Sequence, residues 1–252
     1  MNRSASCIFT FFLFGSTVVA TSHQAETNLQ VQSTYQRLIN AKEWREAQEA
    51  SKKLAAYGPA ALPWILEGTK HQSKLVRKYC FERLCDTFPK ERKAVNRIIE
   101  GVSDPDIGIA YPCAFHLGEH KIKKAEKALR RVLSDPNSSE LLRYSTAKSL
   151  AEIGKTDVFV VLYIGLGSDS FYPRYLSNIG IKALCGKDLT DFGYKGPTEG
   201  AFVSGPAVMR IKGLPIEKAK RKVERWQAIL AFTEWLKVER TKLFEQLSNA
   251  WL

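Results

Sequence analysis

The 252-residue chain lacks the short motifs that mark the common reaction centres. It has no glycine-rich phosphate loop, no dinucleotide-binding fingerprint and no Ser-His-Asp pattern. Histidine is scarce, with four residues, and Gly118 separates His116 from His120. We expect Gly118 to end a helix, so the two rings are not expected to share a face. The Asp191-Phe-Gly193 triplet stands without the other parts of a kinase. The sequence therefore predicts no catalytic residue, no metal site and no cofactor.

Paired cysteines are also missing, since none of the five cysteines forms a C-x-x-C pair. Cys80 and Cys113 hold equivalent positions in neighbouring predicted helices, and packed helices lie about 8–10 Å apart. A disulfide needs Cα atoms within about 7 Å. The spacing therefore favours buried free thiols, with a disulfide framework as the alternative, for Cys80, Cys85, Cys113 and Cys185.

Long hydrophobic runs are limited to one, over residues 8–20. Arg3 precedes this run and small residues end it at Ala20, as in a secretory signal, so we expect cleavage after Ala20. The run is shorter than the roughly 20 apolar residues of a transmembrane helix. Residues 1–20 are therefore predicted to direct export to the periplasm or the cell exterior, and the mature chain is expected to contain no transmembrane segment.

Acidic residues are in deficit, with 26 against 38 basic ones, which gives a net charge of +12. Such a balance favours acidic partners: an acidic protein, nucleic acid or an anionic envelope surface. Predicted export makes nucleic acid the least favoured of the three.

Internal repetition is the strongest positive signal. Three segments align without gaps, 76–84, 109–117 and 142–150, and a fourth, weaker copy follows at approximately 176–184; the last leucines of the four are 33, 33 and 34 residues apart. A second apolar segment precedes each one: 62–66, 95–99, 129–133 and 158–162. The apolar spacing predicts two amphipathic helices per unit. With a leading pair over 27–41 and 43–56, about five helix pairs are expected between residues 27 and 186.

Turn residues fall where these helix pairs require them. Gly58-Pro59 opens one unit, and Asp104-Pro-Asp106 and Asp135-Pro-Asn-Ser138 stand between the two helices of the next two. Their polar side chains are expected to accept hydrogen bonds from the first N–H groups of the second helices. Gly118 and Gly154 are expected to end those helices, and Pro112 to interrupt one of them.

The segments Asp104-Pro-Asp106, Phe115-His-Leu-Gly118 and Ala147–Gly154 resemble HEAT repeats, specifically the short bacterial HEAT-like repeats first described in phycobilin lyases. The resemblance implies an all-α, right-handed α-solenoid. It leaves activity open, because the family ranges from scaffolds to a few enzymes. Ala110 departs from the pattern, since the family usually has a basic residue there, as at Arg77 and Arg143.

The C-terminal third lacks the repeat. Residues 187–215 are rich in glycine and proline, which predicts a loop insert, and residues 216–252 predict basic, tryptophan-containing helices. The Asp-Phe-Gly-Tyr194 tetrad with the following tryptophan-rich helix resembles the closing segment of exported bacterial HEAT-repeat proteins of unknown function. A solenoid must cover its open end. We expect a loop-plus-helix cap that includes Phe192, Tyr194, Trp226 and Trp235.

Basic residues on the second helices are the candidate partner-binding site: Lys74, Arg77, Lys78, Arg143 and Lys148. In HEAT-type solenoids these helices line the concave face, although basic runs on helices are usually only solvated faces. The favoured function is a non-enzymatic binding or scaffold protein of the cell envelope with a protein partner. The alternatives are a nucleic-acid-binding HEAT-like protein, similar to the alkylpurine DNA glycosylases, and a lyase or chaperone-type HEAT enzyme.

Overall fold

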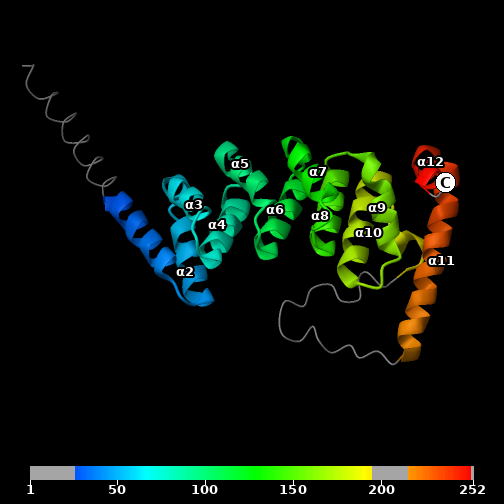
Figure 1. Cartoon of the computed structure of the whole chain (residues 1–252), viewed down its shortest axis with the longest axis horizontal. Coiled ribbons are helices and arrows are strands. Elements are labelled where there is room, and N and C mark those ends of the chain that lie inside the picture. Colours follow the sequence, from blue (N-terminus) through cyan, green and yellow to red (C-terminus); the bar gives the residue numbers. More distant parts are fainter. Residues whose placement is uncertain (1–25, 195–214, 251–252) are drawn as a thin grey trace, which may run out of the picture. The chain divides into compact units, whose positions relative to one another are not determined.

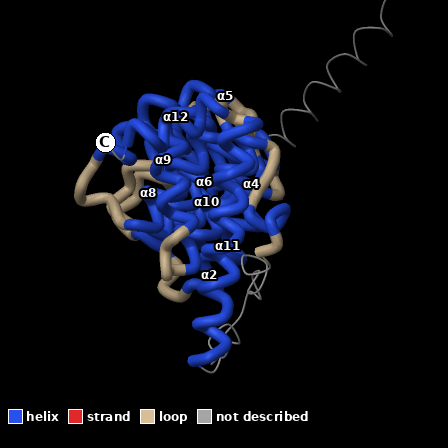
Figure 2. The backbone as a smooth tube through the Cα atoms, turned by 90° about the vertical axis from the view of Figure 1, so that its right-hand side faces the viewer, coloured by secondary structure: helices blue, strands red, loops and turns tan. Residues whose placement is uncertain are grey.

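The structure, a computed structural model, describes residues 26–194 and 215–250. Every regular element in these two ranges is a helix, and they contain no strand (Figure 2). The all-α class is therefore confirmed. The chain divides into two compact units, Met1–Arg97 and Ile98–Leu252, and each is described by itself.

The first unit contains two helix pairs and the start of a third (Figure 1). Its α4 packs against α2 and α3, and Leu38, Leu54, Ile65 and Leu84 form its core. Its elements are the helix over 26–40, α2 (Trp44–Ala55), η1 (Gly58–Ala61), α3 (Leu62–Gly68), α4 (Lys74–Thr87) and the first part of α5 (Arg92–Gly101).

From α6 to α10, longer and shorter helices alternate in the second unit. In it α8 packs against both α6 and α10, while α7 packs against α8 and α9 against α10. Its repeating elements are α6 (Ile107–Glu119), η2 (Lys123–Ala125), α7 (Glu126–Ser134), α8 (Glu140–Glu152), η3 (Thr156–Val158), α9 (Phe159–Leu166) and α10 (Phe171–Cys185). The ten predicted helices between residues 27 and 186 are thus all present within a few residues of their expected places.

The second helices α4, α6, α8 and α10 begin 33, 33 and 31 residues apart. The eleventh residue of each is fully buried: Leu84, Leu117, Leu150 and Ile181. The predicted fourth copy, 176–184, instead placed Leu184 in this position, but Leu184 is only half-buried. Because the last unit is two residues shorter than the others, its matching segment is 173–181.

Side-chain caps begin two of the second helices, α6 and α8, and the first of these was predicted. Asp106 Oδ1 accepts from the Gly108 N–H at 2.8 Å. In the next unit the capping oxygen belongs to Ser139, one residue beyond the predicted stretch, and accepts from the Leu142 N–H at 3.3 Å. Gly154 follows the end of α8 with φ of 92°, a left-handed conformation that favours glycine.

Two predictions about α6 are wrong. Gly118 does not end the helix, which continues to Glu119, and the left-handed residue beyond it is Lys121, with φ of 52°. Gly118 is required by packing instead: a Cβ there would lie 2.5 Å from the Cα of Ser149 in α8. Pro112 does not interrupt α6. As the sixth residue of the helix, it removes only one backbone hydrogen bond near the start.

The C-terminal elements are η4 (Leu189–Phe192), α11 (Pro215–Glu239) and α12 (Thr241–Ala250). Helix α11 packs on η4, and α12 packs on α9 and α11. Within the predicted loop insert, residues 195–214 lie outside the described residues, as do the predicted signal and Trp251. Among the helices that the structure describes, none has a stretch both long and apolar enough to cross a bilayer.

Candidate functional site

The predicted basic residues of α4 have different environments. Lys74 and Lys78 are exposed. Arg77 is half-buried, and its Nη1 donates to the carbonyl oxygens of His71 at 3.2 Å and Gln72 at 2.9 Å. The guanidinium of Arg77 therefore fastens the turn between α3 and α4, which leaves the two lysines as the exposed cations of this helix.

The predicted basic residues of α8 are also not equivalent. Arg143 is half-buried and donates from Nη2 to the carbonyl oxygen of Pro136 at 3.4 Å, in the turn before its helix. Lys148 is only 1% exposed. Its assignment to a partner-binding surface is wrong, because a partner cannot reach a side chain enclosed between packed helices.

Lys148 belongs to a polar cluster inside the contact between α6 and α8. Its Nζ lies 2.8 Å from Glu152 Oε2 and 3.5 Å from the ring centroid of Phe115. Burial lowers the pKa of Lys148 and raises that of Glu152, while their mutual attraction opposes both shifts. The Ser149 hydroxyl donates to the Ala114 carbonyl oxygen at 2.7 Å. The cluster joins two helices and has no opening to solvent at Lys148.

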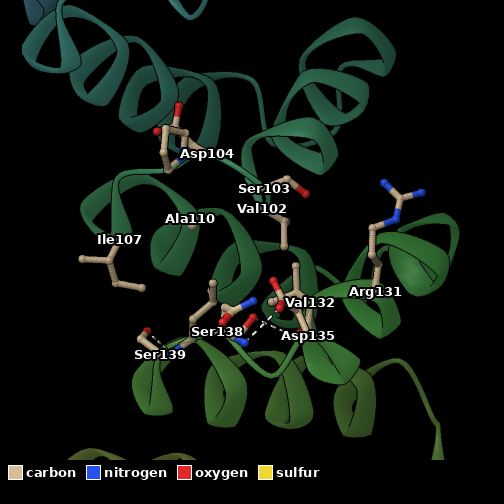
Figure 3. A pocket seen from close by; sticks show the side chains of 13 residues that line it. Val102, Ser103, Asp104, Ile107, Ala110, Arg131, Val132, Asp135, Ser138 and Ser139 are labelled. Carbon is tan, nitrogen blue, oxygen red and sulfur yellow. Dashed lines mark hydrogen bonds between the residues drawn. The ribbon is translucent and has the colours of Figure 1, made fainter.

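A surface cavity of about 540 Å³ lies beside the turns of two consecutive helix pairs (Figure 3). One wall comes from the turn before α6 and from the first residues of α6, and the other from the end of α7 and the turn before α8. The lining residues are Val102, Ser103, Asp104, Pro105, Ile107, Ala110, Arg131, Val132, Asp135, Asn137, Ser138, Ser139 and Leu142.

The polar side chains of this cavity stabilise the turn before α8. Asp135 Oδ1 accepts from the Asn137 N–H at 2.9 Å, and the Ser138 hydroxyl donates to the Val132 carbonyl oxygen at 2.8 Å. In Figure 3, the Arg131 guanidinium stands at the edge opposite Ile107. The cavity thus combines an apolar base with hydroxyl, amide and carboxylate groups from a defined turn, a composition typical of binding sites.

Tyrosine side chains gather on the second helices of this unit. The Phe171 ring stacks on Tyr175 with centroids 5.7 Å apart and meets the edge of Tyr172 at 5.4 Å. On α6, burial raises the pKa of Tyr111, and the phenols of Tyr172 and Tyr175 on α10 raise it further. We call Tyr111, Phe171, Tyr172 and Tyr175 the tyrosine patch. Tyr172 is 41% exposed.

Sequence reasoning missed the tyrosine patch, although a signal was present. Tyr111, Tyr144 and Tyr175 are each the fifth residue of a second helix. The incorrect register of the fourth copy hid this, because it aligned Tyr111 with Asn178.

The four predicted cap residues lie near the last helix pair. The rings of Phe192 and Trp235 have centroids 5.9 Å apart, and Tyr194 is buried. Trp226 is 46% exposed but lies over Gly167, where a Cβ would be 3.1 Å from its ring. Three of these side chains therefore fix η4 and α11 by packing, and the fourth covers the end of α9 while remaining partly open to solvent.

The histidine and cysteine side chains differ in how well they were predicted. The rings of His116 and His120 do share a face, with centroids 4.2 Å apart, which corrects the prediction. In the ranges 26–194 and 215–250, no three histidine, cysteine or acidic side chains are grouped to hold a metal ion. The four cysteines in these ranges are free thiols. Burial raises the pKa of Cys80 to about 12 and that of Cys185 to about 11, so neither is a reactive thiolate.

A search of protein-family models finds none that matches this chain, and a search of curated proteins finds no relative.

Proposed function

We propose that this chain is a non-enzymatic protein of the cell envelope that binds a protein partner through the surface of its second helices. The tyrosine patch is the observation that carries the proposal. Tyrosine is enriched at protein interfaces because its ring supplies a large contact area at low entropic cost, while its hydroxyl forms hydrogen bonds. Half-buried tyrosines from two helices are preorganised for such contact.

A solenoid of HEAT-like helix pairs is part of this proposal. Support comes from the regular starts of the second helices, from the shared burial of their eleventh residues, and from the packing of α8 against both α6 and α10. Stacked pairs of this kind present a continuous side to a partner. The aromatic contacts of η4 and α11 support a cap at the C-terminal end.

A protein partner is favoured over nucleic acid because three of the five predicted cations are bound to carbonyl oxygens or enclosed. The guanidinium groups of Arg77 and Arg143 are engaged by turn carbonyls, and Lys148 is enclosed. Nucleic-acid affinity depends on many exposed contacts to phosphate. The predicted export signal argues in the same direction, and the exposed Lys74 and Lys78 suit an acidic protein surface.

Affinity capture from envelope extract tests this proposal. The mature chain, residues 21–252, is used as bait alongside a Tyr172→Ser variant and an Ile164→Ser control. Both side chains are exposed, by 41% and 53%, but Ile164 lies on the first helix α9. We expect a protein that the wild type and the control retain and the Tyr172 variant loses by tenfold or more. Equal retention by all three baits would remove the tyrosine patch as the binding site.

A further inference from the structure

Three of the four longer turns between paired helices are closed by an arginine in the same place. Arg77, Arg143 and Arg174 are each the fourth residue of a second helix. Each donates from its guanidinium to backbone carbonyl oxygens four to seven residues earlier, in the turn that its helix follows. For Arg174 these are the carbonyls of Ser168 at 2.9 Å and Ser170 at 3.0 Å.

Ala110 is the fourth residue of the remaining helix, α6. The carbonyls that correspond to those bound by the three arginines belong to residues 103–106. Of these, Ser103, Asp104 and Pro105 line the cavity, and so does Ala110 itself (Figure 3). The helix pair before α2 is not comparable, because its turn covers only residues 41–43. The cavity is therefore bordered by the turn and by the helix position that, in the other three pairs, are joined through a guanidinium.

We propose that this cavity binds an arginine side chain of the protein partner, which takes the place of the arginine that α6 lacks. The inference rests on the proposed protein-binding function and names its site and the group recognised. The incoming guanidinium donates to the carbonyl oxygens of Ser103 and Pro105. Its planar set of donors suits several carbonyls at once, which an ammonium group matches less well.

The charges around the cavity allow a cation to enter. Asp135 is exposed on the wall opposite the carbonyls, and the hydroxyls of Ser138 and Ser139 offer further acceptors. Arg131 is the one cation among the lining residues; it is exposed and stands at the edge. Ile107, 42% exposed, supplies an apolar surface for the methylene chain of the bound arginine.

The site is tested with N-acetyl-arginine amide as the probe and N-acetyl-citrulline amide as its uncharged counterpart. Amide resonances of the mature chain are followed by ¹⁵N–¹H NMR. We expect saturable shifts at residues 103–110 and 137–142 with the arginine probe, and at least tenfold weaker binding of the citrulline probe. Equal binding of the two probes, no saturation, or shifts produced by inorganic phosphate instead would overturn the proposal.

A second test fills the cavity with a side chain of the protein itself. An Ala110→Arg chain is expected to close its own turn, to lose the probe-induced shifts, and to melt about 2–4 °C higher, the shift that one modest interaction gives in a chain of this size. Ala110→Leu, which adds volume without donors, is the control and should not melt higher. An Ala110→Arg chain that folds and still binds the probe contradicts the assignment.

A third test removes one of the three arginines and does not depend on the folding of the Ala110→Arg variant. Arg143→Ala is expected to melt lower than the wild type, and millimolar ethylguanidinium is expected to restore a measurable part of the loss, because the turn before α8 then also lacks an arginine at the fourth position of its helix. No restoration would count against the role assigned to these arginines. A partner captured equally by wild type and Ala110→Arg would overturn the cavity assignment and leave the protein-binding proposal standing.

Discussion

The α6–α8 contact and the contact of α11 with the last helix pair each contain a cation that is almost fully buried, but their anions differ. The side chains of Lys148 and Glu152 are 1% and 15% exposed. Arg225 is 6% exposed, whereas its partner Asp169 is 71% exposed. Water thus screens the second pair and hardly reaches the first. Burial dominates the pKa of Lys148 and lowers it, whereas hydrogen bonds from Lys222 and Arg225 lower that of Asp169.

The difference explains what each contact can do. A buried ion pair stabilises little by itself, but the loss of one partner leaves an uncompensated charge in a low dielectric. An exposed partner is readily replaced by water. The α6–α8 contact therefore holds the two helices that border the cavity rigidly together. The ion pairs of Lys222 and Arg225 with Asp169 only attach the first half of α11.

The largest effect is expected from breaking the buried pair. Glu152→Ala leaves Lys148 enclosed without its nearest anion and should lower the free energy of unfolding by about 3–5 kcal/mol. Urea denaturation measures this, with the exposed Glu245→Ala as a control near zero. A Lys148→Met/Glu152→Leu double variant, which removes both charges, should recover most of the loss. A double variant no more stable than the single one would show that the charge is not the cause.

A smaller loss is expected from separating the two helices. Gly118→Ala places a methyl group 2.5 Å from the Ser149 Cα, so α6 must move away from α8, at a cost of about 1–3 kcal/mol. Because the Ser149 Cα is backbone and stays in place when its hydroxyl is removed, adding Ser149→Ala should not restore stability. Recovery in that double variant would mean that the side chain alone limits the approach.

Asp188 provides the mirror image of Arg225, a buried anion with an exposed cation. Its side chain is 8% exposed and that of Lys182 is 61% exposed. Burial raises its pKa, but hydrogen bonds from Thr190 and Lys182 outweigh this and leave it below the ordinary 3.8. The ionised form therefore stabilises the fold above pH 3.8, and that contribution is lost as the pH falls through the lowered pKa.

As the side-chain cap of η4, Asp188 should contribute about 1 kcal/mol near neutral pH. Thermal unfolding of wild type and Asp188→Ala from pH 7 to pH 2.5 tests this. The difference between the two chains should shrink below pH 4. A constant difference over that range would rule out the ionised carboxylate as its source.

The smallest effect is expected at Asp169. Its replacement by asparagine removes an exposed charge but keeps an oxygen that can accept from Arg225, and should cost less than about 1 kcal/mol. The wild type should also lose the same small amount in 0.5 M salt, which the variant should not. A loss as large as that of Glu152→Ala would end the distinction between the two contacts.

Most of the helices could be predicted from local sequence patterns. Apolar spacing placed every repeat helix, and Asp106 and Gly154 act at their helix ends as expected. Sequence reasoning was wrong where a residue serves a neighbouring helix. Gly118 permits close approach rather than ending a helix, and Lys148 is paired inside rather than exposed, and neither role is visible without knowing what packs opposite.

The candidate site was less predictable for the same reason. The exchange of arginine for Ala110 could be seen in the sequence, but its consequence depends on which carbonyls the other arginines bind. The tyrosine patch needed the correct register of α10, and two residues missing from the last unit concealed it.

Site-specific photo-crosslinking in intact cells tests the central claim most directly. A benzophenone side chain is introduced at Tyr172 of the full chain and, as a matched control, at Ile164, which is similarly exposed on α9. Binding through the second helices predicts a discrete protein adduct from the Tyr172 position and none from the Ile164 position. An adduct from the Ile164 position alone, or none from either, would contradict it.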